Sequence, residues 1–158
     1  MILVCLYVDD GYALGKKSNL DQFFKELKGR LNITVEESMG DYLGCEVKFN
    51  KDKTCAWLGQ PHMMKKIEKA FGPKVKTLPK YKTPGTPGFS IVRPRPEEPK
   101  ISDVQQSEYR SGVGMLLYLI KHSRPDLCNA IRELTKCLDG ATPAAYKEML
   151  RVAKYVLD

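Results

Sequence analysis

The sequence predicts an α+β fold in which antiparallel hairpins precede a helical region. Three observations lead to this prediction. Residues 1–60 alternate short apolar runs with turn residues, as hairpins do. Two segments in the first half and three in the second carry apolar residues three and four positions apart, which is typical of one face of a helix. A stretch rich in proline, lysine and glycine separates the two regions. It shows neither the alternation of a strand nor the spacing of a helix.

The first predicted hairpin joins the apolar run 1–8 to a second apolar patch at 12–14. Asp9 and Asp10 lie at its tip, and we expect Gly11 to supply the unusual backbone angle of the turn. A helix follows, predicted over 19–31 from its periodic leucines and phenylalanines. Ser18 is expected to cap this helix.

A second hairpin is predicted from alternating apolar residues over 42–49, with a turn at 50–53 and a returning strand at 54–58. Pro61 is expected to start the next helix, because proline is favoured at the first helical position. The Gly72-Pro73 pair is expected to end it.

The last third of the chain is predicted to be a small helical bundle. Residues 74–100 form a connector, ordered in places or disordered throughout. Ser102 and Gln105 form a capping-box pattern at the start of the first helix after it. Pro125 and the Thr142-Pro143 pair are expected to start two more helices, which pack with the first.

The composition indicates one domain or two small ones in 158 residues, with a net charge of +7. The excess of positive charge comes from residues 61–100, which hold 10 basic and 3 acidic side chains. Such a stripe suits a phosphate backbone, although a solvated linker also accounts for it. No apolar run approaches 18 residues, so no membrane span is expected. Five cysteines without a Cys-x-x-Cys pair argue against zinc and for free thiols in the cytoplasm or nucleus.

Asp9 and Asp10 are the candidate metal ligands. Adjacent carboxylates repel each other, and burial near a strand raises the cost of their charge. A divalent cation removes both problems, and Mg²⁺ usually takes one or two carboxylates together with water and phosphate oxygens. An ordinary solvated turn is the alternative, since Asp-Gly is a common turn dipeptide.

Six stretches, in order along nearly all of the chain, resemble the reverse transcriptase of copia-type LTR retrotransposons. They include the Tyr-Val-Asp-Asp box, a Leu-Gly-x-Glu stretch and a Thr-Pro marker. The positions are 7–10, 42–47, 58–60 with 71–72, 82–84, 109–119 and 123–127. The resemblance implies an RNA-directed DNA polymerase with a partial palm at 1–73, a connector at 74–101 and a helical thumb-like region at 102–158.

The resemblance also implies roles for individual residues. Asp9 and Asp10 would be catalytic carboxylates that bind two Mg²⁺ ions, which clamp the attacking and leaving oxygens. Tyr7 would lie near the primer terminus and the incoming deoxynucleoside triphosphate, and Leu43 and Gly44 would belong to the primer grip. The template–primer duplex, of RNA or DNA, would meet basic side chains at Lys65, Lys66, Lys69, Arg110 and Arg124.

The chain departs from the family pattern in ways that leave its enzymatic status open. A further aspartate on an upstream strand, the fingers segment and any RNase H region lie outside these 158 residues. Residues 36–40 read Glu-Glu-Ser-Met-Gly where the family has a Lys-Asp-Leu-Gly type of run. We therefore expect no polymerase activity from this chain alone, because its active site is incomplete. Two alternatives are a non-catalytic nucleic-acid-binding remnant and a decayed element fragment without function.

Overall fold

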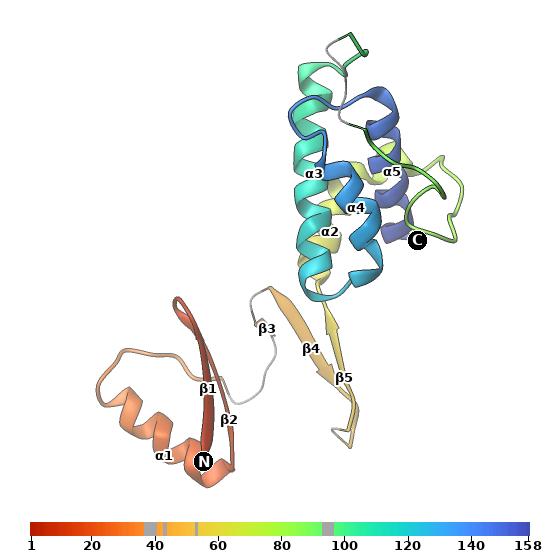
Figure 1. The fold of residues 1–158 in the computed structure, drawn as a ribbon. Coiled ribbons are helices and arrows are strands. Elements are labelled where there is room, and N and C mark those ends of the chain that lie inside the picture. Colours follow the sequence, from red (N-terminus) through yellow and green to blue (C-terminus); the bar gives the residue numbers. More distant parts are fainter. Residues whose placement is uncertain (37–40, 43, 53, 93–96) are drawn as a thin grey trace. The chain divides into compact units, whose positions relative to one another are not determined.

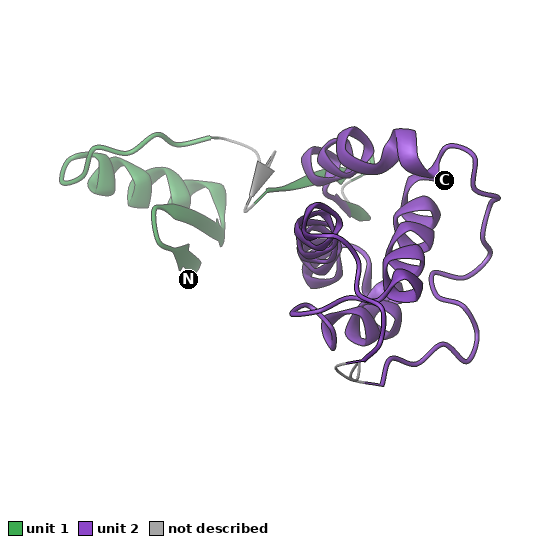
Figure 2. Cartoon of the chain, turned by 90° about the horizontal axis from the view of Figure 1, so that it is seen from above, with its two compact units in different colours: residues 1–57 green, residues 58–158 purple. Residues whose placement is uncertain are grey.

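The computed structural model describes residues 1–36, 41–42, 44–52, 54–92 and 97–158. Strands and helices are both present, so the predicted α+β class is confirmed (Figure 1). The chain divides into two compact units, residues 1–57 and residues 58–158 (Figure 2). No helix in the described ranges combines the length and the apolar character needed to cross a membrane.

The first unit begins with the predicted hairpin. Strands β1 (Ile2–Tyr7) and β2 (Asp10–Gly15) pair antiparallel, with Ile2 opposite Gly15 and Tyr7 opposite Asp10. Helix α1 (Lys17–Lys28) follows and contacts β2. The prediction that Ser18 caps this helix is wrong, because Lys16 occupies the cap position and Ser18 lies inside the helix.

The second hairpin differs from the prediction in one respect. The predicted strand over 42–49 is two strands, β3 (Asp41–Tyr42) and β4 (Cys45–Phe49). Gly44 lies in the turn between them with φ of 72°, a left-handed angle that glycine adopts without a steric cost. Strand β5 (Ala56–Gly59) gives a three-stranded sheet in the order β3-β4-β5.

The second unit is built from helices that pack around a common core. The elements are α2 (Pro61–Val75), α3 (Asp103–His122), the short 3₁₀-helix η1 (Pro125–Leu127), α4 (Cys128–Thr135) and α5 (Pro143–Leu157). The predicted starts at Pro61, Ser102 and Thr142 are confirmed. Ser102 and Gln105 form the capping box, and the Thr142 hydroxyl accepts a hydrogen bond from the Ala145 N–H.

Helix α2 does not end where the sequence predicts. It continues through Gly72 and Pro73, because Ile67, Phe71 and Val75 recur every four residues and are all buried. A proline inside a helix costs about 3 kcal/mol. Burying large apolar side chains contributes roughly 1.5–3 kcal/mol each, which offsets that cost. Helix α2 packs against α5 and α3, and the two compact units divide between Trp57 and Leu58.

The core of the second unit draws on all of its α-helices. Tyr109 of α3 is fully buried, and its hydroxyl donates a hydrogen bond to the Leu134 carbonyl oxygen at 2.7 Å. The same hydroxyl lies 3.2 Å from the Cys137 Sγ atom. Burial raises the pKa of the Tyr109 hydroxyl well above its ordinary value, so the group stays protonated and keeps its donor role.

Three helices meet at Gly112 of α3. A Cβ atom at this position would lie 2.7 Å from the Sδ atom of Met149 on α5 and 2.9 Å from the Cζ atom of Phe71 on α2. Both distances are shorter than real carbon contacts allow, so only glycine lets the three helices approach this closely. Gly114, two residues later on the same helix, has open space at the corresponding position.

These two glycines form a matched pair for a stability test. We expect Gly112→Ala to lower the free energy of unfolding by about 1–3 kcal/mol, the usual cost of overpacking a core. Gly114→Ala should instead raise it by about 0.8–1.0 kcal/mol through helix propensity. Urea denaturation followed by circular dichroism measures both. Equal stability of the two variants would contradict the close approach at Gly112.

Candidate functional site

The acidic tip of the first hairpin is a two-residue turn. Because Tyr7 pairs with Asp10, the turn consists of Val8 and Asp9. The prediction that Gly11 supplies the unusual angle is wrong, since Gly11 lies within β2 opposite Leu6. Val8 instead has φ of 52°, and it is the non-glycine residue with positive φ among those described.

The Val8 angle indicates strain at the turn that carries Asp9. A β-branched residue in the left-handed region is a genuine outlier. A positive φ at the first turn residue alone is the pattern of a type II′ turn, where glycine is usual. Such strain costs on the order of 1–3 kcal/mol and tends to cluster at functional sites. The sequence analysis missed this residue, although a β-branched side chain before Asp-Asp-Gly was a visible signal.

Asp9 lies in the turn and Asp10 is the first residue of β2, and both residues are exposed. As hard oxygen donors, their carboxylates fit the one or two carboxylates that Mg²⁺ takes from a protein. Within the part of the chain that is described, no group of three or more His, Cys, Asp or Glu side chains is placed to hold a metal. Tyr7, which precedes the turn, is 57% exposed.

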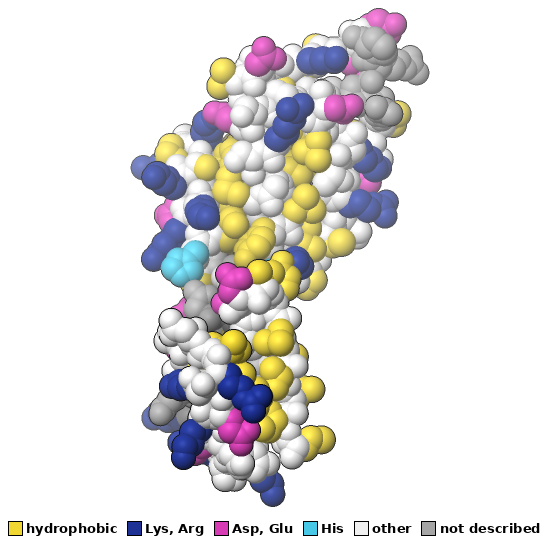
Figure 3. Space-filling view, turned by 90° about the vertical axis from the view of Figure 1, so that its left-hand side faces the viewer, with side chains coloured by type: hydrophobic (Ala, Val, Ile, Leu, Met, Phe, Trp, Pro, Cys, Tyr) yellow, Lys and Arg dark blue, Asp and Glu magenta, His cyan; other side chains and the backbone are white. Residues whose placement is uncertain are grey.

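The hairpin that carries the acids exposes apolar side chains on both of its faces. Leu3 and Val4 are consecutive in β1, so they point to opposite faces, and both are exposed. Leu6 and Leu14 are exposed as well. Among the described residues, the sheet consists of β1 and β2 alone, so both outer edges lack a paired strand. In Figure 3, yellow hydrophobic side chains lie on the visible surface between charged ones.

The predicted primer grip is described only in part. Leu43 lies outside the described residues. Gly44 is exposed in the turn between β3 and β4, and Cys45, which follows it, is buried. The β4–β5 turn is held at Asn50, whose N–H donates to the Cys55 carbonyl oxygen at 3.1 Å and whose Oδ1 atom accepts from the Cys55 N–H at 3.0 Å.

Three of the predicted phosphate contacts lie together on α2. Lys65, Lys66 and Lys69 are all exposed and fall within little more than one helical turn. None of them forms an ion pair with a described acidic residue. These ammonium groups are therefore open to an external anion.

The two predicted arginine contacts already bind groups within the helical unit. Arg110 donates from Nε to the Leu138 carbonyl oxygen at 2.7 Å. Arg124 forms a two-pronged pair with the Asp126 carboxylate, with both N···O distances at 2.9 Å, and lies over the Tyr155 ring. Hydrogen bonding to Asp126 raises the pKa of Arg124 and lowers that of Asp126. Their role in binding nucleic acid stays a prediction, and the α2 lysines are the more accessible candidates.

Gln60 joins the start of α2 to the end of α3, a role that the sequence analysis did not predict. Its side chain is 3% exposed. The Nε2 atom donates to the Tyr118 carbonyl oxygen at 3.1 Å, and the Oε1 atom accepts from the Ser123 hydroxyl at 2.6 Å. Both ends of the amide are thus satisfied, as a buried amide requires.

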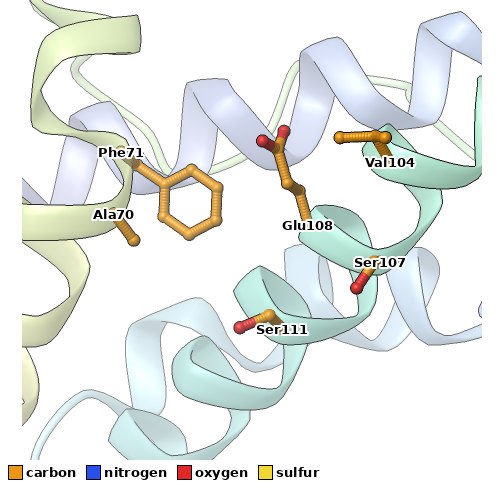
Figure 4. Close-up of a pocket in the computed structure, with 6 residues that line it drawn as sticks. All are labelled: Ala70, Phe71, Val104, Ser107, Glu108 and Ser111. Carbon is orange, nitrogen blue, oxygen red and sulfur yellow. The ribbon is translucent and has the colours of Figure 1, made fainter.

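A pocket of about 510 Å³ opens between α2 and α3 (Figure 4). Ala70 and Phe71 line it from α2, and Glu108 lines it from α3. The Glu108 carboxylate accepts hydrogen bonds from Lys74 at 2.5 Å and from the Tyr146 hydroxyl at 2.6 Å. The Lys74 bond lowers the pKa of Glu108, and the same bond raises the pKa of Lys74. This carboxylate therefore links α2, α3 and α5 and is not free for a ligand.

The connector contains no helix or strand in its described part after α2, as the sequence predicts, yet residues 81–92 bind the helical unit at several points. We call residues 81–92 the strap. Figures 1 and 2 show it running along the outside of the helices. Arg151 stacks over the Tyr81 ring, and the Ile91 N–H donates to the Glu133 carboxylate at 2.9 Å. Glu148, 7% exposed, binds the centre of the strap at Thr86.

The strap attachment at Glu133 should depend on pH. Hydrogen bonds from Lys136 and then from the Ile91 N–H lower the pKa of Glu133 from its ordinary value of 4.5 to about 2. In the folded protein the carboxylate therefore stays charged at a pH where the unfolded chain binds a proton. Its stabilising contribution is present above pH 4.5 and is lost as the pH falls toward 2. The protection factor of the Ile91 amide, taken relative to the intrinsic exchange rate at each pH, should therefore fall across this window.

Glu133→Gln is the control for this titration. The variant keeps an acceptor oxygen but cannot gain a proton, so the fall in the Ile91 protection factor between pH 4.5 and 2 should be largely absent. NMR exchange measurements on both proteins provide the comparison. The same pH profile in the variant would show that Glu133 does not hold the strap.

The strain at Val8 allows a second test. We expect Val8→Gly to stabilise the hairpin by on the order of 1 kcal/mol, because glycine adopts the left-handed angle without a steric cost. Val4→Gly, the same substitution in the middle of β1, should destabilise it through the entropy of glycine in a strand. Amide exchange across the β1–β2 pair measures both effects. Faster exchange in Val8→Gly than in the unmodified chain would argue against strain at the turn.

Comparison with known proteins finds a similarity that extends over almost the whole chain. The chain is 24% identical, over 162 aligned residues and 98% of its length, to the retrovirus-related Pol polyprotein from transposon TNT 1-94 of Nicotiana tabacum. It spans 12% of that protein's length. No protein-family model matches the chain, and no solved structure matches it. The similarity supports an origin in the Pol polyprotein of a retrotransposon.

Proposed function

We propose that the chain is a fragment of a retrotransposon reverse transcriptase, an RNA-directed DNA polymerase that works by two-metal nucleotidyl transfer. The observation that carries the proposal is the strained Val8 turn, which presents Asp9 and Asp10 at the tip of an antiparallel hairpin. The similarity to a transposon Pol polyprotein along 98% of the chain supports it. The six ordered motifs point to the same class of enzyme.

Each residue has a distinct task in this proposal. Asp9 and Asp10 hold Mg²⁺, with Asp9 in the turn as the more direct ligand. The ions supply charge stabilisation for the attacking and leaving oxygens of the phosphoryl group. Tyr7 lies beside the primer terminus and the incoming deoxynucleoside triphosphate, and Gly44 belongs to the hairpin that holds the primer end. A misplaced end costs rate steeply, since the reaction depends on close alignment of the reacting atoms.

The exposed faces of the hairpin agree with a role as part of a larger sheet. Leu3, Val4 and Leu6 are apolar and exposed, and such surfaces are usually covered in a working protein. We propose that the covering segment is the remaining palm, which also brings a further aspartate to the metal site. The chain alone is therefore expected not to extend a primer.

The lysines of α2 are the proposed contact to the template–primer duplex. Lys65, Lys66 and Lys69 are exposed and unpaired among the described residues, and they sit on a helix whose opposite side is anchored in the core. A rigid row of ammonium groups binds successive phosphates through charge and releases condensed counterions. Because the helical unit has its own core, it would bind nucleic acid even without catalysis. This observation favours the non-catalytic binding module as the second candidate function.

Salt-dependent binding tests the proposed contact. We expect the full chain to bind an RNA–DNA primer–template duplex, and the triple variant Lys65→Gln, Lys66→Gln, Lys69→Gln to bind about tenfold or more weakly. The slope of log affinity against log salt should fall by about 0.9 for each phosphate that the variant no longer neutralises. Fluorescence anisotropy over a salt series measures both quantities.

The control removes the same charge from another helix. Lys17→Gln, Lys25→Gln, Lys28→Gln changes three exposed lysines of α1 and should leave the affinity and the salt slope close to those of the unmodified chain. The double variant Asp9→Asn, Asp10→Asn should bind the duplex as tightly as the unmodified chain, since the two acids are proposed to act in catalysis and not in duplex binding. An equal decrease in affinity in both lysine variants would show that only net charge matters. Primer extension by the chain alone that disappears in Asp9→Asn would show a complete active site.

A further inference from the structure

The strap contains a direct tandem repeat, Thr-Pro-Gly at 83–85 and again at 86–88. The two threonines occupy different surroundings. Thr83 donates from its hydroxyl to the Gly85 carbonyl oxygen at 3.0 Å and accepts from the Arg151 Nη2 atom at 3.3 Å. Thr86 contacts a carboxylate instead. The repeat therefore places one hydroxyl beside a cation and the other beside an anion.

The Thr86 attachment is the central one of the strap. The Thr86 N–H donates to Glu148 Oε1 at 2.6 Å, and its hydroxyl donates to Oε2 at 2.8 Å. Both oxygens of a buried carboxylate are thus satisfied by one residue, and hydrogen bonds to a charged acceptor are the stronger kind. Gly85 sits close above α4, since a Cβ atom there would lie 3.2 Å from the Ala130 Cβ atom.

We propose that Thr86 is a phosphorylation site for a proline-directed protein kinase, and that its phosphorylation releases the strap from Glu148. In the reaction, the Thr86 oxygen forms a bond to the γ-phosphorus of ATP. The bond from that phosphorus to the bridging oxygen of ADP breaks, and the hydroxyl proton passes to a base of the kinase. The products are phosphothreonine and ADP.

The site is accessible to such an enzyme. Thr86 is exposed, proline follows it directly, and Gly88 after the proline has φ of 75°. The segment belongs to no helix or strand, so a kinase can bind it in an extended form without unfolding an element.

Release follows from the charge that phosphorylation adds. The hydroxyl donor is replaced by a group carrying about −1.5 to −2 charges at neutral pH, and a phosphoryl group next to a carboxylate disrupts the contact by repulsion. Glu148 is held within α5 and is buried, so it cannot move away into water. We therefore expect the strap to move, which would widen the pocket of about 460 Å³ that the strap and α4 line together.

Thr83 is the internal comparison. A phosphoryl group on this residue would face the Arg151 guanidinium, which already binds the Thr83 carbonyl and hydroxyl oxygens at 3.3 Å. Charge-assisted bonds from arginine to phosphate are favourable. The same modification three residues earlier should therefore leave the strap bound. The proposal does not depend on polymerase activity.

The experiment treats the full chain with a purified proline-directed kinase and Mg²⁺-ATP, and tandem mass spectrometry maps the modified residue. Thr86→Ala and Thr83→Ala separate the two acceptors. Amide exchange is then measured by NMR at Phe89, whose N–H bonds the Thr86 carbonyl oxygen at 3.0 Å, and at Thr86 itself. We expect phosphorylation at Thr86 to accelerate exchange of the Thr86 amide by about tenfold or more, the shift that loss of one hydrogen bond to a charged group gives. Exchange at Phe89 should accelerate as well, because its turn loses the support of the Thr86 contact. The Ala145 amide, which bonds the Thr142 hydroxyl outside the strap, serves as the reference amide.

Two outcomes support the proposal and four overturn it. Incorporation at Thr86 with faster exchange supports it, as does a much smaller acceleration in Glu148→Gln, where the phosphoryl group meets no charge. Modification of neither threonine, or of Thr83 alone, overturns it. Modified Thr86 with unchanged exchange overturns the release, for example because Arg151 pairs with the phosphoryl group. Equal acceleration from phosphothreonine at 83 and at 86 overturns it as well, because it would show a general effect of added charge.

Discussion

The helical unit depends on the close approach of three helices at Gly112. Phe71 and Met149 fill the space that a side chain on this glycine would need, which brings α2 and α5 against α3. Helix α2 continues through Pro73, which buries Val75 in the same core as Phe71. Once α2 is fixed, its polar side and the three lysines on it face outward.

Several residues in the stretches that resemble polymerase motifs form hydrogen bonds that hold the helical unit together. Tyr109 bonds the end of α4, Gln60 bonds the end of α3, and Arg124 holds Asp126 at the start of η1. The Thr-Pro marker belongs to the strap. These short motifs therefore specify architecture, whereas the Tyr-Val-Asp-Asp stretch has no comparable packing role. Its valine has a strained backbone angle and its acids are exposed, which agrees with the catalytic role proposed for this turn.

The features that could be predicted from the sequence are those that depend on neighbouring residues, such as the starts of helices. Ser102 with Gln105 and Thr142 with Pro143 mark helix starts through caps that neighbouring residues form, and both were confirmed. The errors concern features that depend on packing between residues far apart in the sequence. Helix α2 was expected to end at Gly72-Pro73, yet it continues to Val75, which is buried against the other helices of the unit. The strap contacts at Glu133 and Glu148 could not be predicted, since they join residues 42 and 62 positions apart. The placing of the hairpin turn on Val8 depends on register, which a one-residue shift changes completely.

The helical unit has a buried core, whereas the hairpin that carries the acids exposes apolar side chains on both faces. Native-state hydrogen exchange of the full chain tests this contrast most directly. Amides of α2, α3 and α5 should exchange only through global unfolding, with protection of several kcal/mol. Amides that join β1 and β2 should exchange far faster, because both faces of that pair are exposed. Equal protection of the hairpin and the helices would contradict the account, since it would mean that the chain already covers the hairpin.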